Sequence, residues 1–494
     1  MINLARYIKI DRESTFPVYL QIAESIITLI QQGILPACVR IQTSRDLSDK
    51  LHVHRKTVVI AYNELLEQGW LQSRPRKGIF VSAFFPTLTP IHITQNAQLI
   101  QDFADTTNFD IGYGPERLLI RSNTQPAYRY IFNDGFPDAR LAPLDALLKE
   151  YQSLGKLKLS RRLLMYAAKE GSLNLRQTLA NEFRQTRGMP VTAENILITR
   201  GAQMAIFLTA SLLIKPGDVV IVGEPNYFLA NLMLKRLGAE LVGVPVDDNG
   251  MDVAQVEKIC KERLVRMIYV IPHHHHPTTV MLSPERRLKL LAIAEKYRIA
   301  VIEDDFDFDI QFEGEPVLPI ASIDRTGNII YIGTLSKILA PAIRIGFIVA
   351  PKNLISLLAQ HRFLIDMQGD NLLEETINLL YKDGTMHRHI KKIRRAYKER
   401  RDLMCSILNK LGDRISFKVP DGGMSLWIQF KGIDTKSVAK AAAQNGLFIC
   451  DGEKHNTPKK DFNSICLGFA SMNNNELEQA LSILNRSVMK ITKQ

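Results

Sequence analysis

Six short apolar segments, separated by stretches with helical spacing, constrain the fold of this chain more than any other feature. They are ILITR, VVIVG, RMIYVI, IAVIED, NIIYIG and FIVA, and all lie between residues 196 and 350. Apolar strands that alternate with helices are typical of a parallel α/β sheet. Ligands bind such sheets at the carboxyl ends of the strands. We therefore expect a mostly parallel sheet whose functional residues follow its strands.

Carboxylates follow one of these strands directly. IAVIEDDFDFD places Asp304 at the end of a buried strand, with Glu303, Asp305, Asp307 and Asp309 around it. Carboxylate oxygens are ligands that Mg²⁺ accepts, so this stretch taken alone is compatible with a magnesium site.

A lysine follows another strand. GTLSKILAPAIRIGF places Lys337 among apolar neighbours, where a surface lysine fits poorly, with Thr334 and Ser336 before it and Arg344 after it as donors for an anion. Pyridoxal phosphate requires an amine for a Schiff base, a carboxylate for its ring nitrogen and donors for its phosphate. Lys337, Asp304 and Arg344 supply one of each.

Two further segments fit the same cofactor. TRGAQMAI predicts a strand-to-helix turn whose backbone N–H groups cradle a phosphate, and Gly201 allows close approach there. Tyr227 in EPNYF is expected to lie against the face of the cofactor ring.

An N-terminal unit, residues 14–82, has a different pattern. PVYLQIAESIITLIQQGIL has helical spacing and stops at Gly33. TSRDLSDKLHV predicts a short helix capped by Thr43 or Ser44, and HRKTVVIAYNELLEQG a second helix closed by Gly69. Two short helices with a tight connection indicate a helix-turn-helix, and WLQSRPRKGIFVS indicates a winged hairpin.

Basic residues of this unit concentrate at the start of the second helix and in the hairpin. In helix-turn-helix proteins such positions face phosphates and base edges. The candidate DNA-binding residues are Arg45, His54, Arg55, Lys56, Thr57, Arg74, Arg76 and Lys77. On local sequence alone, the alternative is a small helical domain with a solvated basic face.

The remaining features bound the class of protein. Residues 83–127 mix Pro, Thr, Asn and Gln without a sustained period and are expected to form a linker. The net charge of +12 is compatible with nucleic acid or an anionic small molecule. The first residues lack the pattern of a secretory signal, and apolar runs such as AIFLTASLLI fall short of the ~20 residues that span a bilayer. We expect a cytoplasmic protein with no membrane partner.

These motifs resemble a known family of bacterial regulators. The first unit is similar to the GntR-type winged helix through SR, TV, EQGWL and GIFV. Residues 128–494 resemble a fold-type I aminotransferase, with a smaller C-terminal α+β subdomain, through FNDGFPDARLAP, YAAKEGSLNLRQTLA, LITRGAQMA, GEPNYF, VIEDDFDF, PDGGMSLW and CLGFA. A chain with both parts is similar to the MocR/GabR-like regulators.

The resemblance implies a pyridoxal 5'-phosphate cofactor, with Lys337 and Asp304 as catalytic residues. With the residues above, the expected cofactor-binding set is Lys337, Asp304, Arg344, Gly201, Ala202, Gln203, Tyr227, Thr334, Ser336, His276 and Tyr166. Tyr166 would reach the phosphate of the partner subunit, which implies a homodimer with composite sites.

Several positions depart from the family pattern. Phe306 stands where a tyrosine is often present, and Cys466 stands where an arginine often binds a substrate carboxylate. His276 and Thr279 replace an asparagine and a glycine. The run of four histidines also allows a metal or tag interpretation, which its position inside a motif disfavours, and no metal site is expected.

The leading hypothesis is a transcription regulator that binds double-stranded DNA through residues 14–82 and senses an amine or amino acid through the cofactor domain. One alternative is a working aminotransferase with an accessory DNA-binding domain, although Phe306 and Cys466 predict weak turnover. The other is a repressor whose large domain is only a dimerisation scaffold. The basic segment IKKIRRAYKERR is a solvated helix face or a second, non-specific DNA contact.

Overall fold

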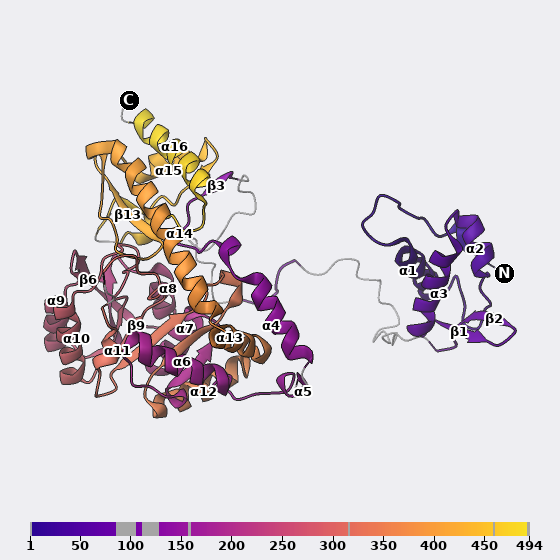
Figure 1. Ribbon diagram of the computed structural model, residues 1–494, viewed down its shortest axis with the longest axis horizontal. Coiled ribbons are helices and arrows are strands. Elements are labelled where there is room, and N and C mark those ends of the chain that lie inside the picture. Colours follow the sequence, from indigo (N-terminus) through magenta and orange to yellow (C-terminus); the bar gives the residue numbers. More distant parts are fainter. Residues whose placement is uncertain are drawn as a thin grey trace. The chain divides into compact units, whose positions relative to one another are not determined.

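The computed structural model describes residues 2–84, 105–110, 128–156, 160–314, 317–457 and 460–491. It forms two compact units, Met1–Gly114 and Pro115–Gln494, and each is considered by itself (Figure 1). Most of the expected linker, residues 83–127, lies outside the described residues. None of the helices in the described ranges has both the length and the apolar character needed to cross a bilayer.

The N-terminal unit is a helix-turn-helix followed by a hairpin, as predicted. Its elements are η1 (Leu4–Arg6), α1 (Val18–Gln31), α2 (Ser44–Leu51), α3 (Arg55–Glu67), β1 (Leu71–Arg74) and β2 (Gly78–Val81). The two strands are antiparallel, with Leu71 opposite Val81. The side chain of Thr43 accepts a hydrogen bond from the Asp46 N–H at 3.2 Å, so Thr43 is the cap of α2.

The core of this unit follows from the helical spacing of its apolar residues. Ile22 and Ile26 of α1 pack with Leu47 of α2 and Val58 of α3, and all four are fully buried. Because these residues occupy one side of each helix, the polar and basic side chains remain on the outer faces.

The C-terminal unit contains an eight-stranded sheet in the order β4-β11-β10-β9-β8-β5-β6-β7. The strands are β4 (Ile196–Thr199), β5 (Val219–Glu224), β6 (Glu240–Asp247), β7 (Gly250–Met251), β8 (Val265–Val270), β9 (Ala300–Asp304), β10 (Ile329–Thr334) and β11 (Gly346–Val349). The pairs from β10 through β9, β8 and β5 to β6 are parallel, which confirms the predicted mostly parallel sheet.

FIVA, one of the six apolar segments, runs antiparallel to both of its neighbours in the sheet. This segment belongs to β11, which pairs antiparallel with both β10 and β4. The connection from β10 to β11, residues 335–345, is too short for the crossover of a dozen or more residues that parallel neighbours require. Sequence reasoning also missed β6, whose burial is mixed because it lies near the edge of the sheet.

Helices cover both faces of this sheet. The helices between residues 144 and 382 are α4 (Leu144–Lys156), α5 (Ser160–Leu163), α6 (Leu173–Arg187), α7 (Ala202–Leu213), α8 (Phe228–Arg236), α9 (Val253–Glu262), α10 (Pro284–Tyr297), α11 (Ile320–Ile323), α12 (Lys352–Asp366) and α13 (Asn371–Lys382), of which α4 packs on α13. Ile330 and Ile332 of β10 pack in the core with α7, α8 and α12. Ile329 and Tyr331 point to the other face, toward the cores with α9 and α10 and with α6 and α13.

A smaller α+β subdomain follows, which confirms the expectation for the C-terminal part. Its elements are β12 (Ile415–Phe417), β13 (Ser425–Phe430), β15 (Ser464–Gly468), α14 (Thr385–Leu408), α15 (Thr435–Ala443) and α16 (Asn474–Ile491). In Figure 1, α14 to α16 lie together beside β13. The strand β14 (Leu447–Phe448) pairs with β3 (Tyr130–Ile131), so the start of the unit joins this subdomain.

Candidate cofactor site and nucleic-acid interface

The residues expected to bind a cofactor follow parallel strands of the large sheet. Asp304 ends β9, and Lys337 follows β10 by three residues. Gly201 follows β4, and Tyr227 follows β5. Because the carboxyl ends of parallel strands meet at one edge, these side chains gather at a common site.

Lys337 is half-buried and held by the chain segment that follows β3. Its Nζ donates a hydrogen bond to the carbonyl oxygen of Gly135 at 2.9 Å and lies 5.2 Å and 5.6 Å from the ring centres of Phe136 and Phe306. Burial lowers the pKa of Lys337 below its ordinary value, although nearby carboxylates such as Asp307 oppose it. A lowered pKa increases the fraction of neutral amine, which is the nucleophilic form.

Asp304 presents one free oxygen to the site. Its Oδ2 accepts a hydrogen bond from the hydroxyl of Tyr269 at 2.6 Å, whereas its Oδ1 is buried and has no partner among the described residues. Burial raises the pKa of Asp304 to about 7, with Tyr269 opposing and Asp305 adding to the shift. An unpaired buried carboxylate oxygen is costly, and a ring N–H would satisfy it.

The other carboxylates of IAVIEDDFDFD are engaged within the protein. Glu303 accepts two backbone N–H bonds at 2.8 Å, and Asp305 accepts a hydrogen bond from Tyr331 at 2.9 Å. Asp307 lies 2.9 Å from His274, and Asp309 is paired with Arg187 at 2.9 Å. Across the described ranges, no three His, Cys, Asp or Glu side chains are grouped to hold a metal ion.

The side chains of the histidine run, residues 273–276, lie against these carboxylates and against Tyr227. The Nδ1 of His273 lies 3.0 Å from Asp305, and the Nδ1 of His275 is 2.9 Å from the Thr278 hydroxyl. His276 packs edge-on against Tyr227, with ring centres 5.5 Å apart. Burial holds the pKa of His276 far below its ordinary value, so this ring is neutral.

Gly201 and Arg344 lie against each other at the start of α7, and together they are called the Arg344–Gly201 cradle below. Gly201 adopts φ +81 there, and a Cβ at this position would lie 2.9 Å from a guanidinium nitrogen of Arg344. The same guanidinium donates to the carbonyl oxygen of Arg200 at 2.8 Å. The buried Ser336 hydroxyl has no partner in the described part of the chain, whereas the Thr334 hydroxyl donates to the Ile345 carbonyl oxygen at 3.0 Å. Ser336 is therefore the better placed of the two hydroxyls.

Tyr227 connects the two ends of this site. Its hydroxyl is 3.4 Å from Oε1 of Gln203, which with Ala202 begins α7. Burial raises the pKa of Tyr227; the Asp304 charge adds to this rise and Arg344 opposes it. Both groups are thus within electrostatic reach of one ring.

Two positions singled out in the sequence, Cys466 and Tyr166, do not add a charged or buried polar group to this site. Cys466 lies in β15 opposite Trp427, and burial raises the pKa of its thiol to about 12, so it is neutral. Tyr166 is 78% exposed and lies beside the exposed Leu164 and Met165. Its predicted contact is with a partner subunit, and that stays a prediction.

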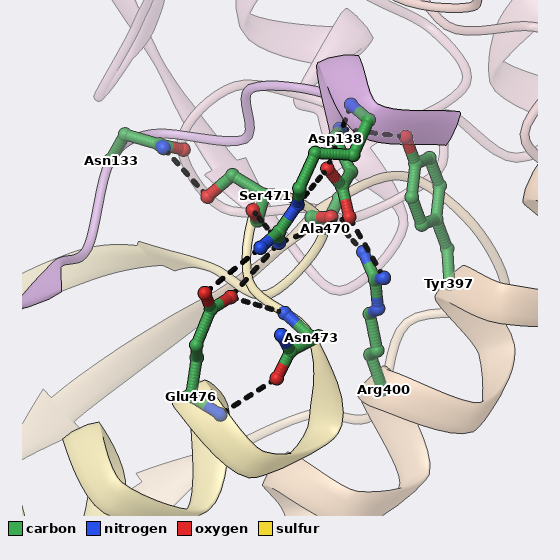
Figure 2. Close-up of polar contacts among 9 residues, drawn as sticks. Asn133, Asp138, Tyr397, Arg400, Ala470, Ser471, Asn473 and Glu476 are labelled. Carbon is green, nitrogen blue, oxygen red and sulfur yellow. Dashed lines mark hydrogen bonds and ion pairs between the residues drawn. The ribbon is translucent and has the colours of Figure 1, made fainter. Parts of the chain in front are cut away.

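The motif FNDGFPDARLAP contains the segment that holds Lys337, a role that its sequence does not reveal. A polar network fixes this segment to the small subdomain (Figure 2). Asn133 donates to Ser471 at 2.9 Å, and the Asp138 carboxylate accepts from Arg400 at 2.9 Å. Arg140 donates to Asp138 and to Glu476, each at 2.8 Å. The backbone that carries Asp134 and Gly135 is therefore well anchored.

The predicted DNA-binding residues lie at the starts of α2 and α3 and in the β1–β2 hairpin. Arg45 lies in the first turn of α2, Arg55 begins α3, and His54 caps α3 by accepting from the Lys56 N–H at 3.2 Å. Thr57 is half-buried. The exposed side chains are Arg45, His54, Arg55, Lys56, Arg74, Arg76 and Lys77. The six Arg and Lys side chains of this set form no ion pair among the described residues, and Arg74 lies 4.7 Å from the ring centre of Phe80. Exposed cations of this kind are suited to phosphate contacts.

Known proteins similar to this chain identify its family and its fold. A family model described as aminotransferase class I and II matches residues 133–484, and one described as bacterial regulatory proteins, gntR family, matches residues 18–81. The uncharacterized HTH-type transcriptional regulator YdfD of Bacillus subtilis is 29% identical over 461 residues, covering 92% of this chain and 93% of YdfD. The probable rhizopine catabolism regulatory protein MocR of Rhizobium meliloti is 27% identical over 495 residues, covering 98% and 96%.

A solved structure, the multiple substrate aminotransferase of Thermococcus profundus, superposes with a TM-score of 0.72 at 26% identity, covering 78% of this chain and all of that one. The class I and II model spans well over half of the chain, and the gntR model covers the helix-turn-helix before it. The chain therefore belongs to the aminotransferase class I and II family, in the MocR/GabR-type arrangement in which a gntR-family winged helix precedes that domain.

Proposed function

We propose that this protein is a cytoplasmic transcription regulator that binds double-stranded DNA and senses an amine or amino acid through bound pyridoxal 5'-phosphate. The observation that carries the proposal is one chain that combines exposed basic residues, which form no ion pairs among the described residues, with the Lys337 amine and the Asp304 carboxylate. The first feature suits a phosphate backbone, and the second suits the cofactor.

The residues around Lys337 fit the cofactor group by group. The Lys337 amine would attach its carbonyl carbon, and the free Oδ1 of Asp304 would accept from its ring nitrogen. Arg344, Ser336 and the turn at Gly201 would hold its phosphate. When bound, pyridoxal phosphate supplies an electron sink for an attached amine. Tyr227 would lie against the ring face.

A homodimer is part of the proposal. The exposed apolar side chains of the C-terminal unit include Leu144, Leu148, Tyr151, Leu164, Met165, Tyr166, Phe363 and Leu364. Exposed apolar surface of this kind marks protein–protein interfaces. A second copy that covered α4 and the Tyr166 segment would bring that hydroxyl toward the Arg344–Gly201 cradle of the partner subunit.

Two residues favour sensing over efficient catalysis. Phe306 has no hydroxyl for the ring oxygen, and Cys466 offers a neutral thiol rather than a charge-assisted donor. The alternative, an active aminotransferase with an accessory DNA-binding unit, is supported by Lys337, by Asp304 and by the fold of its solved relative. Slow conversion of an amine is compatible with both.

The test measures whether the two units communicate. Genomic DNA bound by the full chain is first identified, and its affinity is then measured with and without a panel of amines. Amines are expected to change the affinity of the wild type and to leave Lys337→Ala unchanged. An equal response in both proteins would contradict sensing through the cofactor.

DNA binding itself is tested at α2 and α3. Replacing Arg45, Arg55 and Lys56 by alanine is expected to weaken binding to all sequences and to reduce the log–log salt slope by about 0.9 per lost phosphate contact. The matched control removes three exposed cations of the other unit, Lys215, Lys258 and Lys289. Equal loss in both triple variants would show that overall charge, not this face, binds DNA.

A further inference from the structure

A partly buried ion pair lies beside Lys337 on the small-subdomain side of the site. The Lys454 ammonium contacts the Asp134 carboxylate, and these side chains are 17% and 27% exposed. Asp134 directly precedes Gly135, whose carbonyl oxygen accepts the hydrogen bond from Lys337. A second ammonium group is therefore held next to the backbone that holds the first.

His455, the residue after Lys454, packs among aromatic side chains near the proposed cofactor. The His455 ring lies 5.6 Å from the His276 ring and 5.4 Å from Trp427, centre to centre. His455 is 3% exposed, and neither of its ring nitrogens has a partner among the described residues. Trp427 is opposite Cys466 in the β13–β15 register. Lys454 thus belongs to a wall that runs from His276 to Cys466.

Stability alone does not account for this ion pair. Taking two charges out of water costs free energy that their attraction often only offsets, so a buried pair is weak evidence for stabilisation. An ammonium has three donors, and Asp134 is the sole hydrogen-bond acceptor of Lys454 within the described ranges. Burial acts to lower the pKa of Lys454, but Asp134 outweighs it and the pKa lies above its ordinary value. Lys454 is therefore a cation with donors to spare.

We propose that Lys454 binds an anionic group of the effector, and hence that the effector is an amine that also carries a carboxylate or a similar anion. The effector amine would approach Lys337, and its anion would share Lys454 with Asp134. This assignment rests on the proposed function, because it requires that an amine reaches the cofactor. Lys454 would then supply the positive charge that binds the anion, because the Cys466 thiol is neutral.

The experiment measures amine binding to the cofactor-loaded full chain by its visible absorbance. The probes are straight-chain amino acids, from glycine to 6-aminohexanoate, each paired with the alkylamine of the same carbon number. The quantity of interest is the ratio of the two dissociation constants for each pair. The variants are Lys454→Met, Lys454→Arg and Asp134→Asn. Lys436→Met is the control, because Lys436 is exposed in the same subdomain and lies 3.9 Å from Glu453.

The wild type is expected to prefer at least one amino acid over its alkylamine. Lys454→Met should reduce that preference about tenfold to a hundredfold, the range for a charge-assisted hydrogen bond. Lys454→Arg should keep it. Asp134→Asn should increase it, because Lys454 would no longer share its charge. A role in folding alone would not move the two partners in opposite directions.

Other outcomes separate this inference from the function on which it rests. A preference that survives in Lys454→Met, or falls in both Lys454→Met and Asp134→Asn, overturns the role of Lys454 and leaves the cofactor proposal standing. If Lys454→Met does not fold, the Asp134→Asn result decides. If no amine of either kind changes the cofactor absorbance, both the sensing proposal and this inference are wrong.

Discussion

The two sides of the site differ in how closely they follow the family pattern. On the large-sheet side, Lys337, Asp304 and Arg344 offer the amine, the carboxylate and the guanidinium that the proposed pyridoxal phosphate would use. On the small-subdomain side, Cys466 is neutral, and the charge comes instead from the Lys454–Asp134 pair. The proposed cofactor side thus retains the groups that the proposal needs, and the proposed effector side carries its charge on Lys454 rather than on residue 466.

The largest effect is expected from removing the Lys337 amine, to which the cofactor would attach. Lys337→Ala should abolish the visible absorbance of bound cofactor and any borohydride-trapped adduct, because it removes the half-buried amine that follows β10. Lys352→Ala is the control, since Lys352 is exposed and paired with Glu194. An adduct trapped at a different lysine in the Lys337→Ala protein would show that the cofactor side has been misplaced.

The next effect is on the stability of the cofactor-free protein. The pKa of Asp304 is about 7 in the folded state and about 3.9 in an unfolded chain, so the folded state binds this proton more tightly. Between these values, the free energy of unfolding should fall as pH rises, by up to about 1.4 kcal/mol per pH unit. Asp304→Asn lacks this loss, so its stability advantage over the wild type should grow from pH 4 to pH 7 and then level off.

Denaturant titration of both proteins across this pH range measures the difference. Glu303 is common to both, so its titration largely cancels. If the difference in unfolding free energy between Asp304→Asn and the wild type does not change with pH, then the charged form of Asp304 does not destabilise the folded state.

The same substitution should weaken the cofactor. Asp304→Asn replaces a charged acceptor for the ring nitrogen, which costs about 1.5–3 kcal/mol, or roughly tenfold to a hundredfold in affinity. Equilibrium dialysis gives the dissociation constant, with the exposed Asp413→Asn as control. Undiminished affinity would mean that the free Oδ1 of Asp304 does not bind the ring.

The smallest effect is expected at Phe306. Phe306→Tyr adds a hydroxyl near the Lys337 amine that could donate to the ring oxygen of the cofactor. It should tighten cofactor binding by about 0.5–1.5 kcal/mol, the value of a neutral hydrogen bond. Phe306→Leu has no hydroxyl and should not tighten it. Equal changes in both variants would indicate a packing effect.

The gathering of Lys337, Asp304 and Gly201 could be predicted from the sequence, whereas the position of Lys454 could not, for a physical reason. Lys337, Asp304 and Gly201 each follow an apolar strand, and the ends of parallel strands meet, so local pattern was sufficient. Lys454 lies in a loop without a periodic pattern, and its partner Asp134 is 320 residues away in the chain. The antiparallel direction of β11 was also hidden, because an apolar strand carries no signal of its direction.

The most direct test of the central claim is steady-state transamination by the full chain across a panel of amino donors and keto acids. We predict that amines change the cofactor absorbance while kcat stays far below the enzyme median of about 10 s⁻¹ for every pair. A kcat near that median for any pair would contradict the account, because the proposed effector side would then support efficient turnover.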